Sequence, residues 1–152
     1  MIDHVIDGDE VFELLDRVVA GVGKDFVYQD AFGEHCTYFA YEGIEGVDEF
    51  GNRTSEWQYG EPVQPPQPRC IVGQALFLVG AEPSDFIEDK IIDMVRIGMG
   101  DEGDHPVSAY LTDEAKRILA HVQADQDMRV SWGRAVEAAR RAERGDNEAS
   151  TP

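Results

Sequence analysis

Cys70 is the residue of this sequence with the clearest potential for catalytic chemistry. It opens an apolar segment, 70–80, that is predicted to form a buried helix. A thiol at a helix N-terminus lies at the positive end of the helix dipole, which favours the nucleophilic thiolate. His105 or His121 could then act as its base, as in papain-like enzymes. The alternative is a small apolar residue packed at a helix start, which we favour because no protease signature surrounds Cys70.

A second group of chemically capable residues crowds the glycine-rich segment 98–106, namely Asp101, Glu102, Asp104 and His105. Oxygen ligands at this density are typical of Ca²⁺ or Mg²⁺ sites, but the spacing differs from that of an EF-hand loop. The histidines and cysteines of the chain show no paired spacing of the kind that binds zinc. A solvated acidic loop is therefore favoured over a metal site, and no cofactor is predicted. The formal GxGxxG match at 98–103 is discounted because its acids would repel phosphate.

The residues best suited to bind a partner are Glu56, Trp57, Tyr59 and Glu61. They lie in 42–68, a segment rich in glycine and proline that is long for a connection inside a compact domain. Residues 56–59 could add a short strand to this excursion. The combination of aromatic and acidic side chains on an excursion from a small scaffold indicates a surface for binding another protein.

The elements that position these residues follow from the spacing of apolar side chains. Helical spacing predicts helices over about 10–21, 70–80, 84–98 and 113–126, and a last helix capped by Ser131. Asp9 is the expected N-cap of the first helix, with Gly21 and Gly23 as its stop, and Thr112 is the expected cap of the helix at 113–126. Aromatic and β-branched residues in 26–29 and 36–41 predict a β-hairpin. The fold class is therefore α+β and mostly α, with an N-terminal helix and a β-hairpin packed on about four C-terminal helices. Residues 1–144 are expected to form one globular domain, and 145–152 a disordered tail.

The predicted core centres on Trp132. Small residues on its helical stripe should bring the last helix close to the 118–122 face, with Leu76 and Gly73 beneath the indole. Gly73 permits a close approach of another element, either Trp132 or the hairpin. Gln123, Gln126 and Asp127 are suited to hydrogen-bond the turn that leads into the last helix.

The charge of the chain restricts its partners. Its 152 residues include 31 acidic and 13 basic side chains, for a net charge of −18. Phosphate backbones and anionic lipids should repel such a surface, so direct binding to nucleic acid or membranes is not expected. No apolar run approaches the ~20 residues that span a bilayer, and the acidic N-terminus does not look like a signal peptide, which predicts a cytoplasmic protein. The arginines of 129–144 are assigned to a solvated helix face that complements the acidic remainder.

The segment Arg69-Cys-Ile-Val-Gly-Gln-Ala-Leu76, followed by Gln126-Asp127 and Trp132-Gly-x-Ala-Val136, resembles small uncharacterised proteins of actinobacteria and their bacteriophages. The resemblance covers about 36–41 and 69–139, and it implies no particular activity. It implies the cytoplasm of a bacterial host as the location. The excursion at 42–68 departs from the shorter connection that is typical of the pattern.

These observations favour a non-enzymatic, phage-encoded acidic accessory protein that binds a host protein. A narrower version is a nucleic-acid mimic, whose carboxylates occupy the basic groove of a nucleic-acid-binding protein. Two alternatives from other classes stay open: a thiol-dependent enzyme that uses Cys70, and a structural protein of the virion.

Overall fold

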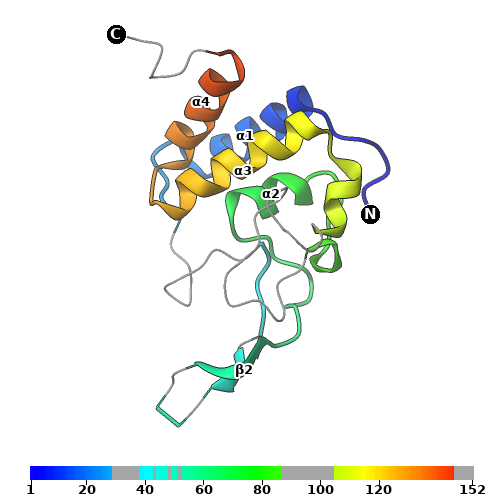
Figure 1. The fold of residues 1–152 in the computed structure, drawn as a ribbon, viewed down its shortest axis with the longest axis vertical. Helices are drawn as coiled ribbons and strands as arrows, with labels where there is room; N and C mark the ends of the chain where they lie inside the picture. The colour runs from blue at the N-terminus through cyan, green and yellow to red at the C-terminus, as the bar shows by residue number, and fades with distance from the viewer. Residues whose placement is uncertain (29–37, 43, 48, 51–52, 87–104, 146–152) are drawn as a thin grey trace.

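The computed structural model describes residues 1–28, 38–42, 44–47, 49–50, 53–86 and 105–145. Within these ranges the chain forms four α-helices: α1 (Gly8–Val22), α2 (Ile71–Phe77), α3 (Asp113–Asp127) and α4 (Trp132–Glu143). Two short 3-10 helices, η1 (Pro83–Asp85) and η2 (Pro106–Tyr110), precede α3, and two strands, β1 (Ile44–Val47) and β2 (Arg53–Tyr59), lie between α1 and α2 in sequence. The α-helices pack together into one helical body, from which the strands project (Figure 1).

The helix predicted at 10–21 is confirmed as α1, although its N-cap is Asp7 and not Asp9. The Asp7 side chain accepts a hydrogen bond from the N–H of Glu10 at 2.9 Å, which satisfies one of the free donors of the first turn. Gly23 ends the helix with a φ of +100°, a conformation that favours glycine. One face of α1 is buried against the other helices, through Val11, Leu14, Leu15 and Val18.

The predicted pairing of the last two helices is also confirmed. α3 begins at the Thr112 cap, whose hydroxyl accepts from the N–H of Ala115 at 3.1 Å, and it packs along α4. The turn between the two helices contains Arg129 in a left-handed conformation, with a φ of +64°. The bidentate contact of Arg117 with Glu143 joins the two helices at the surface, with distances of 2.7 and 3.0 Å.

Helix α2 is the central element of the body. It contacts both α1 and α3, and its first turns are completely buried at Ile71, Val72 and Leu76. A Cβ at Gly73 would collide with the carbonyl oxygen of Tyr38, so the absence of a side chain there lets the 38–42 segment lie directly on the helix. Of the two partners predicted for Gly73, the structure therefore selects the segment assigned to the hairpin and not Trp132.

Trp132 is fully buried, as predicted, and it also packs against aromatic rings that were not predicted as its neighbours. Its ring lies 4.6 Å from that of Phe26 and 6.2 Å from that of Tyr28, measured between ring centres. The backbone of the same segment caps the start of α4: the N–H of Trp132 donates to the carbonyl of Phe26, and the N–H of Gly133 to that of Lys24. Residues 24–28 thus cap the last helix in place of the Ser131 side chain, which makes no capping hydrogen bond.

The prediction of an α+β fold with a hairpin at 26–29 and 36–41 is wrong, because the packed body is helical. Residues 29–37 lie outside the described ranges, and 26–28 form no strand. Phe39 and Tyr41 make only isolated bridges, to Pro68 and Pro62. The physical reason is that aromatic residues are common both in strands and in buried cores. Tyr38 and Phe39 are buried in the core, where the ring of Tyr38 stacks on that of Phe86 with a centre distance of 4.3 Å.

The two strands form a separate antiparallel ribbon, which we define as residues 44–59. Its register pairs Ile44 with Tyr59 and Glu45 with Gln58, and an irregularity follows before Val47 pairs with Arg53. Neither strand has an extensive contact with a described helix. The ribbon is joined to the body through the 41–62 bridge and through the N–H of Glu42, which donates to the carbonyl of Glu61. It therefore extends the molecule without adding a layer to the core (Figure 1).

The helix predicted at 84–98 lies mostly outside the described residues. Its first residues form η1, where the N–H of Glu82 donates to the carboxylate of Asp85 at 2.7 Å, and Phe86 follows as a buried residue. The predicted tail, 145–152, is described only at Gly145.

Candidate functional site

Cys70, the candidate nucleophile, lies in the core as the N-cap of α2. Its side chain is fully buried, and its Sγ accepts a hydrogen bond from the N–H of Gly73 at 3.5 Å. The N–H of Ile71 donates to Oε1 of Gln126 on α3, at 2.8 Å. The thiol of Cys70 and the amide of Gln126 therefore accept hydrogen bonds from N–H groups of the first turn of α2. The thiol stabilises the helix, whereas a nucleophile would have to face a substrate.

The two histidines considered as bases for Cys70 have other surroundings. His105 is buried between aromatic rings, 5.1 Å from that of Tyr38 and 5.8 Å from that of Phe86. His121 is on the surface of α3, with its Nδ1 3.8 Å from the carboxylate of Asp125. In the described ranges, no hydrogen bond joins either imidazole to the thiol. This geometry gives no support to a thiol-dependent active site.

Of the candidate metal ligands in 98–106, the structure describes only His105. Asp101 and Asp104 lie outside the described residues, and His105 is enclosed by the rings of Tyr38 and Phe86. Among the residues that the structure describes, no group of three His, Cys, Asp or Glu side chains is arranged to hold a metal ion.

The sequence-based prediction for the hydrogen bonds of two buried glutamines is wrong. Gln123 and Gln126 do not fix the turn before α4; they connect α3 to distant parts of the chain. Oε1 of Gln123 accepts from the hydroxyl of Tyr38 at 2.8 Å, and Gln126 caps α2. Both occupy the apolar stripe of α3, and a polar residue on such a stripe indicates a buried hydrogen-bond partner.

Two arginines on the helices are paired with carboxylates at the surface. Arg140 lies 2.7 Å from the carboxylate of Asp16 and stacks over the ring of Phe12 at 4.8 Å. The guanidinium of Arg117 donates two hydrogen bonds to Glu143, which lowers the pKa of that carboxyl group. These contacts agree with the assignment of the C-terminal arginines to a face that complements the acids of the body.

The predicted partner-binding residues all belong to the ribbon or its base. Glu56, Trp57 and Tyr59 are on β2, and Glu61 is exposed where the chain returns to the body. Sequence reasoning missed Phe50, which lies in the connection between β1 and β2 and is 80% exposed. A large aromatic residue between two runs of strand-forming residues was the signal that could have identified it.

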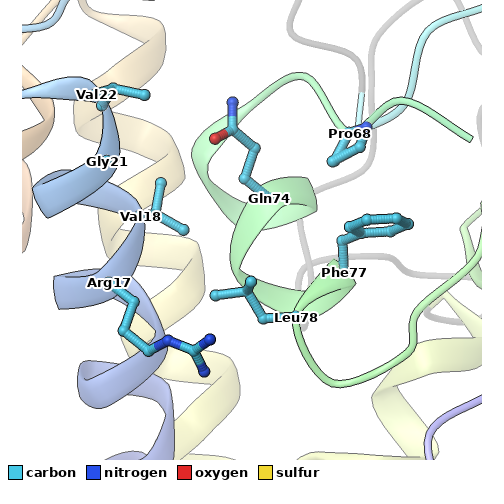
Figure 2. A pocket seen from close by; sticks show the side chains of 8 residues that line it. All are labelled: Arg17, Val18, Gly21, Val22, Pro68, Gln74, Phe77 and Leu78. Atoms are coloured by element: carbon cyan, nitrogen blue, oxygen red, sulfur yellow. The ribbon is translucent and has the colours of Figure 1, made fainter.

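A second candidate surface is a groove between α1 and α2, of about 390 Å³ (Figure 2). The α1 wall consists of Arg17, Val18, Gly21 and Val22. The facing wall consists of Pro68 and of three residues at α2, Gln74, Phe77 and Leu78. We call this feature the α1–α2 groove.

The α1–α2 groove is apolar and open to solvent. Val22, Phe77 and Leu78 are 38%, 40% and 42% exposed, although each is a large apolar residue. In Figure 2 the Arg17 guanidinium extends into the space beside Leu78, while Gln74 lies across from Val22. Sequence reasoning treated 70–80 as buried on nearly every side and therefore did not detect this surface.

Comparisons with known proteins found no matching family model, no matching curated protein and no matching solved structure. No helix in the described part of the chain is long and apolar enough to cross a membrane.

Proposed function

We propose that this protein is a non-enzymatic accessory protein that binds a basic partner protein through the ribbon. The observation that carries the proposal is the position of the ribbon, which projects from the helical body without an extensive contact to a described helix (Figure 1). An element that contributes little to the core is free to present its surface to another molecule. Following the resemblance to phage and actinobacterial proteins, we assign the partner to the cytoplasm of a bacterial host.

The charge of this element indicates the chemistry of the partner. Residues 42–61 contain a single base, Arg53, and six acids: Glu42, Glu45, Asp48, Glu49, Glu56 and Glu61. Clustered charge of one sign speeds the encounter with a partner of the opposite sign and disfavours acidic competitors. The exposed ring of Phe50 supplies an apolar contact at the end of the ribbon, and aromatic residues are enriched among those that dominate binding energy.

The test compares two variants with the same change of net charge. In the first, exposed acids of the ribbon and its base are neutralised, as Glu42→Gln, Glu49→Gln and Glu61→Gln. In the matched control, exposed acids of the body are neutralised, as Glu13→Gln, Asp25→Asn and Glu137→Gln. Proteins captured from a bacterial lysate by the parent chain are quantified by mass spectrometry at low and high salt.

We expect the ribbon variant to lose a basic partner that the control still captures, and we expect raised salt to weaken that capture. Equal capture by the two variants would contradict the proposal. Competition by duplex DNA for the same partner would support the narrower version, in which the acids imitate phosphates. Replacing Phe50 by Ala should weaken the same capture without changing its dependence on salt.

A further inference from the structure

The charge in the α1–α2 groove is opposite in sign to the net charge of the molecule. Arg17 is the one charged residue among those that line it, in a chain whose net charge is −18. Arg117 and Arg140 are each paired with a carboxylate at 2.7 Å. In the described part of the chain, Arg17 makes no such pair, although acids outnumber bases by more than two to one. The groove therefore combines an uncovered apolar surface with an available cation.

The apolar part of the groove would be stabilised by being covered. Val22, Phe77 and Leu78 keep about two fifths of their surface in water, and covering apolar surface contributes roughly 25 cal/mol per Å². Isolated exposed apolar residues are common, but three on facing helix walls form a patch of the kind found at interaction sites. The patch is separate from the ribbon, since none of its residues belongs to 44–59.

We propose that the α1–α2 groove docks a short apolar peptide segment of a partner protein, with a carboxylate of that segment paired to Arg17. The apolar side chains of the peptide would lie between the α1 wall and Phe77 and Leu78. This site goes beyond the function proposed for the ribbon and does not depend on it.

Two other occupants fit the observations less well. A second copy of this chain would bring two molecules of charge −18 together, and their repulsion opposes association. A small molecule would need a more enclosed site, because such ligands are usually buried over most of their surface. A peptide that bears a carboxylate would pair with the cation and cover the open apolar walls.

Gly21 provides a way to block the groove without disturbing the fold. An added Cβ at this position would meet no atom within 4 Å, so a larger side chain would extend into free space at the α1 wall. Leucine also has a higher helix propensity than glycine, so Gly21→Leu should fold at least as well as the parent chain. Ala20→Leu is the matched control, because Ala20 is exposed on the same helix but does not line the groove.

The probes are two synthetic peptides, acetyl-Gln-Leu-Ala-Glu-Leu-Leu-Gln-amide and the same peptide with Gln in place of Glu. Binding is measured by NMR titration of the full chain. We expect the Glu peptide to shift the amide signals of 17–22 and 74–78 and to bind about two- to fivefold more tightly than the Gln peptide. Gly21→Leu should weaken both peptides roughly tenfold or more, whereas Ala20→Leu should leave them unchanged.

Arg17→Gln completes the test, because it should abolish the difference between the two peptides while the weaker apolar binding persists. Several results would overturn the proposal: no detectable binding of either peptide, equal affinity for both peptides in the parent chain, or unchanged binding in Gly21→Leu. Concentration-dependent dimerisation that Gly21→Leu abolishes would identify a second copy as the occupant instead. Because every variant leaves 44–59 intact, loss of peptide binding with retained capture through the ribbon distinguishes this proposal from the first.

Discussion

The helical body and the ribbon differ in what holds each of them in shape. The body is packed around completely buried side chains that come from distant parts of the chain, including Leu15, Tyr38, Ile71 and Trp132. The ribbon is held by backbone pairing from Ile44–Tyr59 to Val47–Arg53, and it has no extensive contact with a described helix. The stability of the body should therefore depend on individual side chains, whereas the ribbon should tolerate changes and remain free to evolve a binding surface.

The two tryptophans provide the largest test of this difference. Trp132→Ala should lower the free energy of unfolding by about 3–5 kcal/mol, because it removes a fully buried indole that contacts Phe26 and Tyr28. Trp57→Ala, on β2, should change it by less than about 0.5 kcal/mol, because β2 has no extensive contact with a described helix. Chemical denaturation of both variants measures the effect. Similar losses would mean that the ribbon is an integral part of the folded domain.

Replacing glycine by alanine should change the stability of the protein in opposite directions at two positions on neighbouring helices. Gly73→Ala places a methyl group against the carbonyl of Tyr38 and should destabilise the body by about 1–3 kcal/mol. Gly21→Ala meets open space in the last turn of α1 and should stabilise the protein by up to about 1 kcal/mol. Thermal unfolding of the two variants checks both signs. A neutral Gly73→Ala would show that the 38–42 segment can move away from α2.

Gln126 tests whether the body also depends on its buried polar contacts. Gln126→Leu removes the acceptor for the N–H of Ile71 and leaves that donor buried, which should cost about 1–3 kcal/mol. The control is Gln67→Leu, since Gln67 is exposed near the base of the ribbon, and we expect little change. Urea denaturation compares the two. If the variants were equally stable, another group would have to satisfy the N-terminus of α2.

The smallest effect concerns the N-terminal segment, which is held to α1 by His4. The imidazole of His4 donates hydrogen bonds to the carboxylates of Asp3 (2.8 Å) and Glu10 (2.7 Å), and these bonds raise the pKa of His4 above its ordinary value. Its contribution to stability is therefore complete below the ordinary histidine pKa of about 6.5 and is lost as the pH rises through the raised pKa of the folded protein. NMR titration should show the raised midpoint in the parent chain and a lower one in Asp3→Asn.

The stability of His4→Gln completes that test. Relative to the parent chain, the variant should be less stable at about pH 5 and equally stable once both His4 states are neutral, near pH 9. The ribbon variants described above should show no such pH-dependent difference, since the hydrogen-bond partners of His4 in the described structure are Asp3 and Glu10. A midpoint of His4 at or below its ordinary value would contradict the contacts of this segment.

The accessible residues of this protein are not those with the most reactive side chains. Cys70 and His105 attracted attention because thiols and imidazoles can perform catalysis, but both are buried among apolar neighbours. A reactive side chain that is recognised in a sequence can act in catalysis only where solvent and substrate can reach it. The surfaces that remain accessible, at Phe50 and in the α1–α2 groove, contain ordinary aromatic and aliphatic side chains.

The sequence by itself determined the features that depend on nearby residues and on composition. The apolar stripe and terminal glycines predicted α1, the Thr112 cap predicted the start of α3, and the excess of acids predicted the charge of the surface. These features are local because a helix is formed by hydrogen bonds between residues four apart, and its buried face repeats with the helical period.

Only the tertiary structure decided that 26–28 and 38–41 pack against the helices without forming a hairpin. It likewise decided the register of the ribbon, the burial of Cys70 and the existence of the α1–α2 groove. Each depends on contacts between residues far apart in the chain, such as Tyr38 with Gln123 and Ile71 with Gln126. Aromatic and β-branched residues are favoured both in strands and against a helical core, so their pattern alone does not distinguish the two environments. The distinction was made by the glycine at 73 and the amides of α3, which bring the 38–42 segment onto α2 and α3 and leave the ribbon to pair with itself.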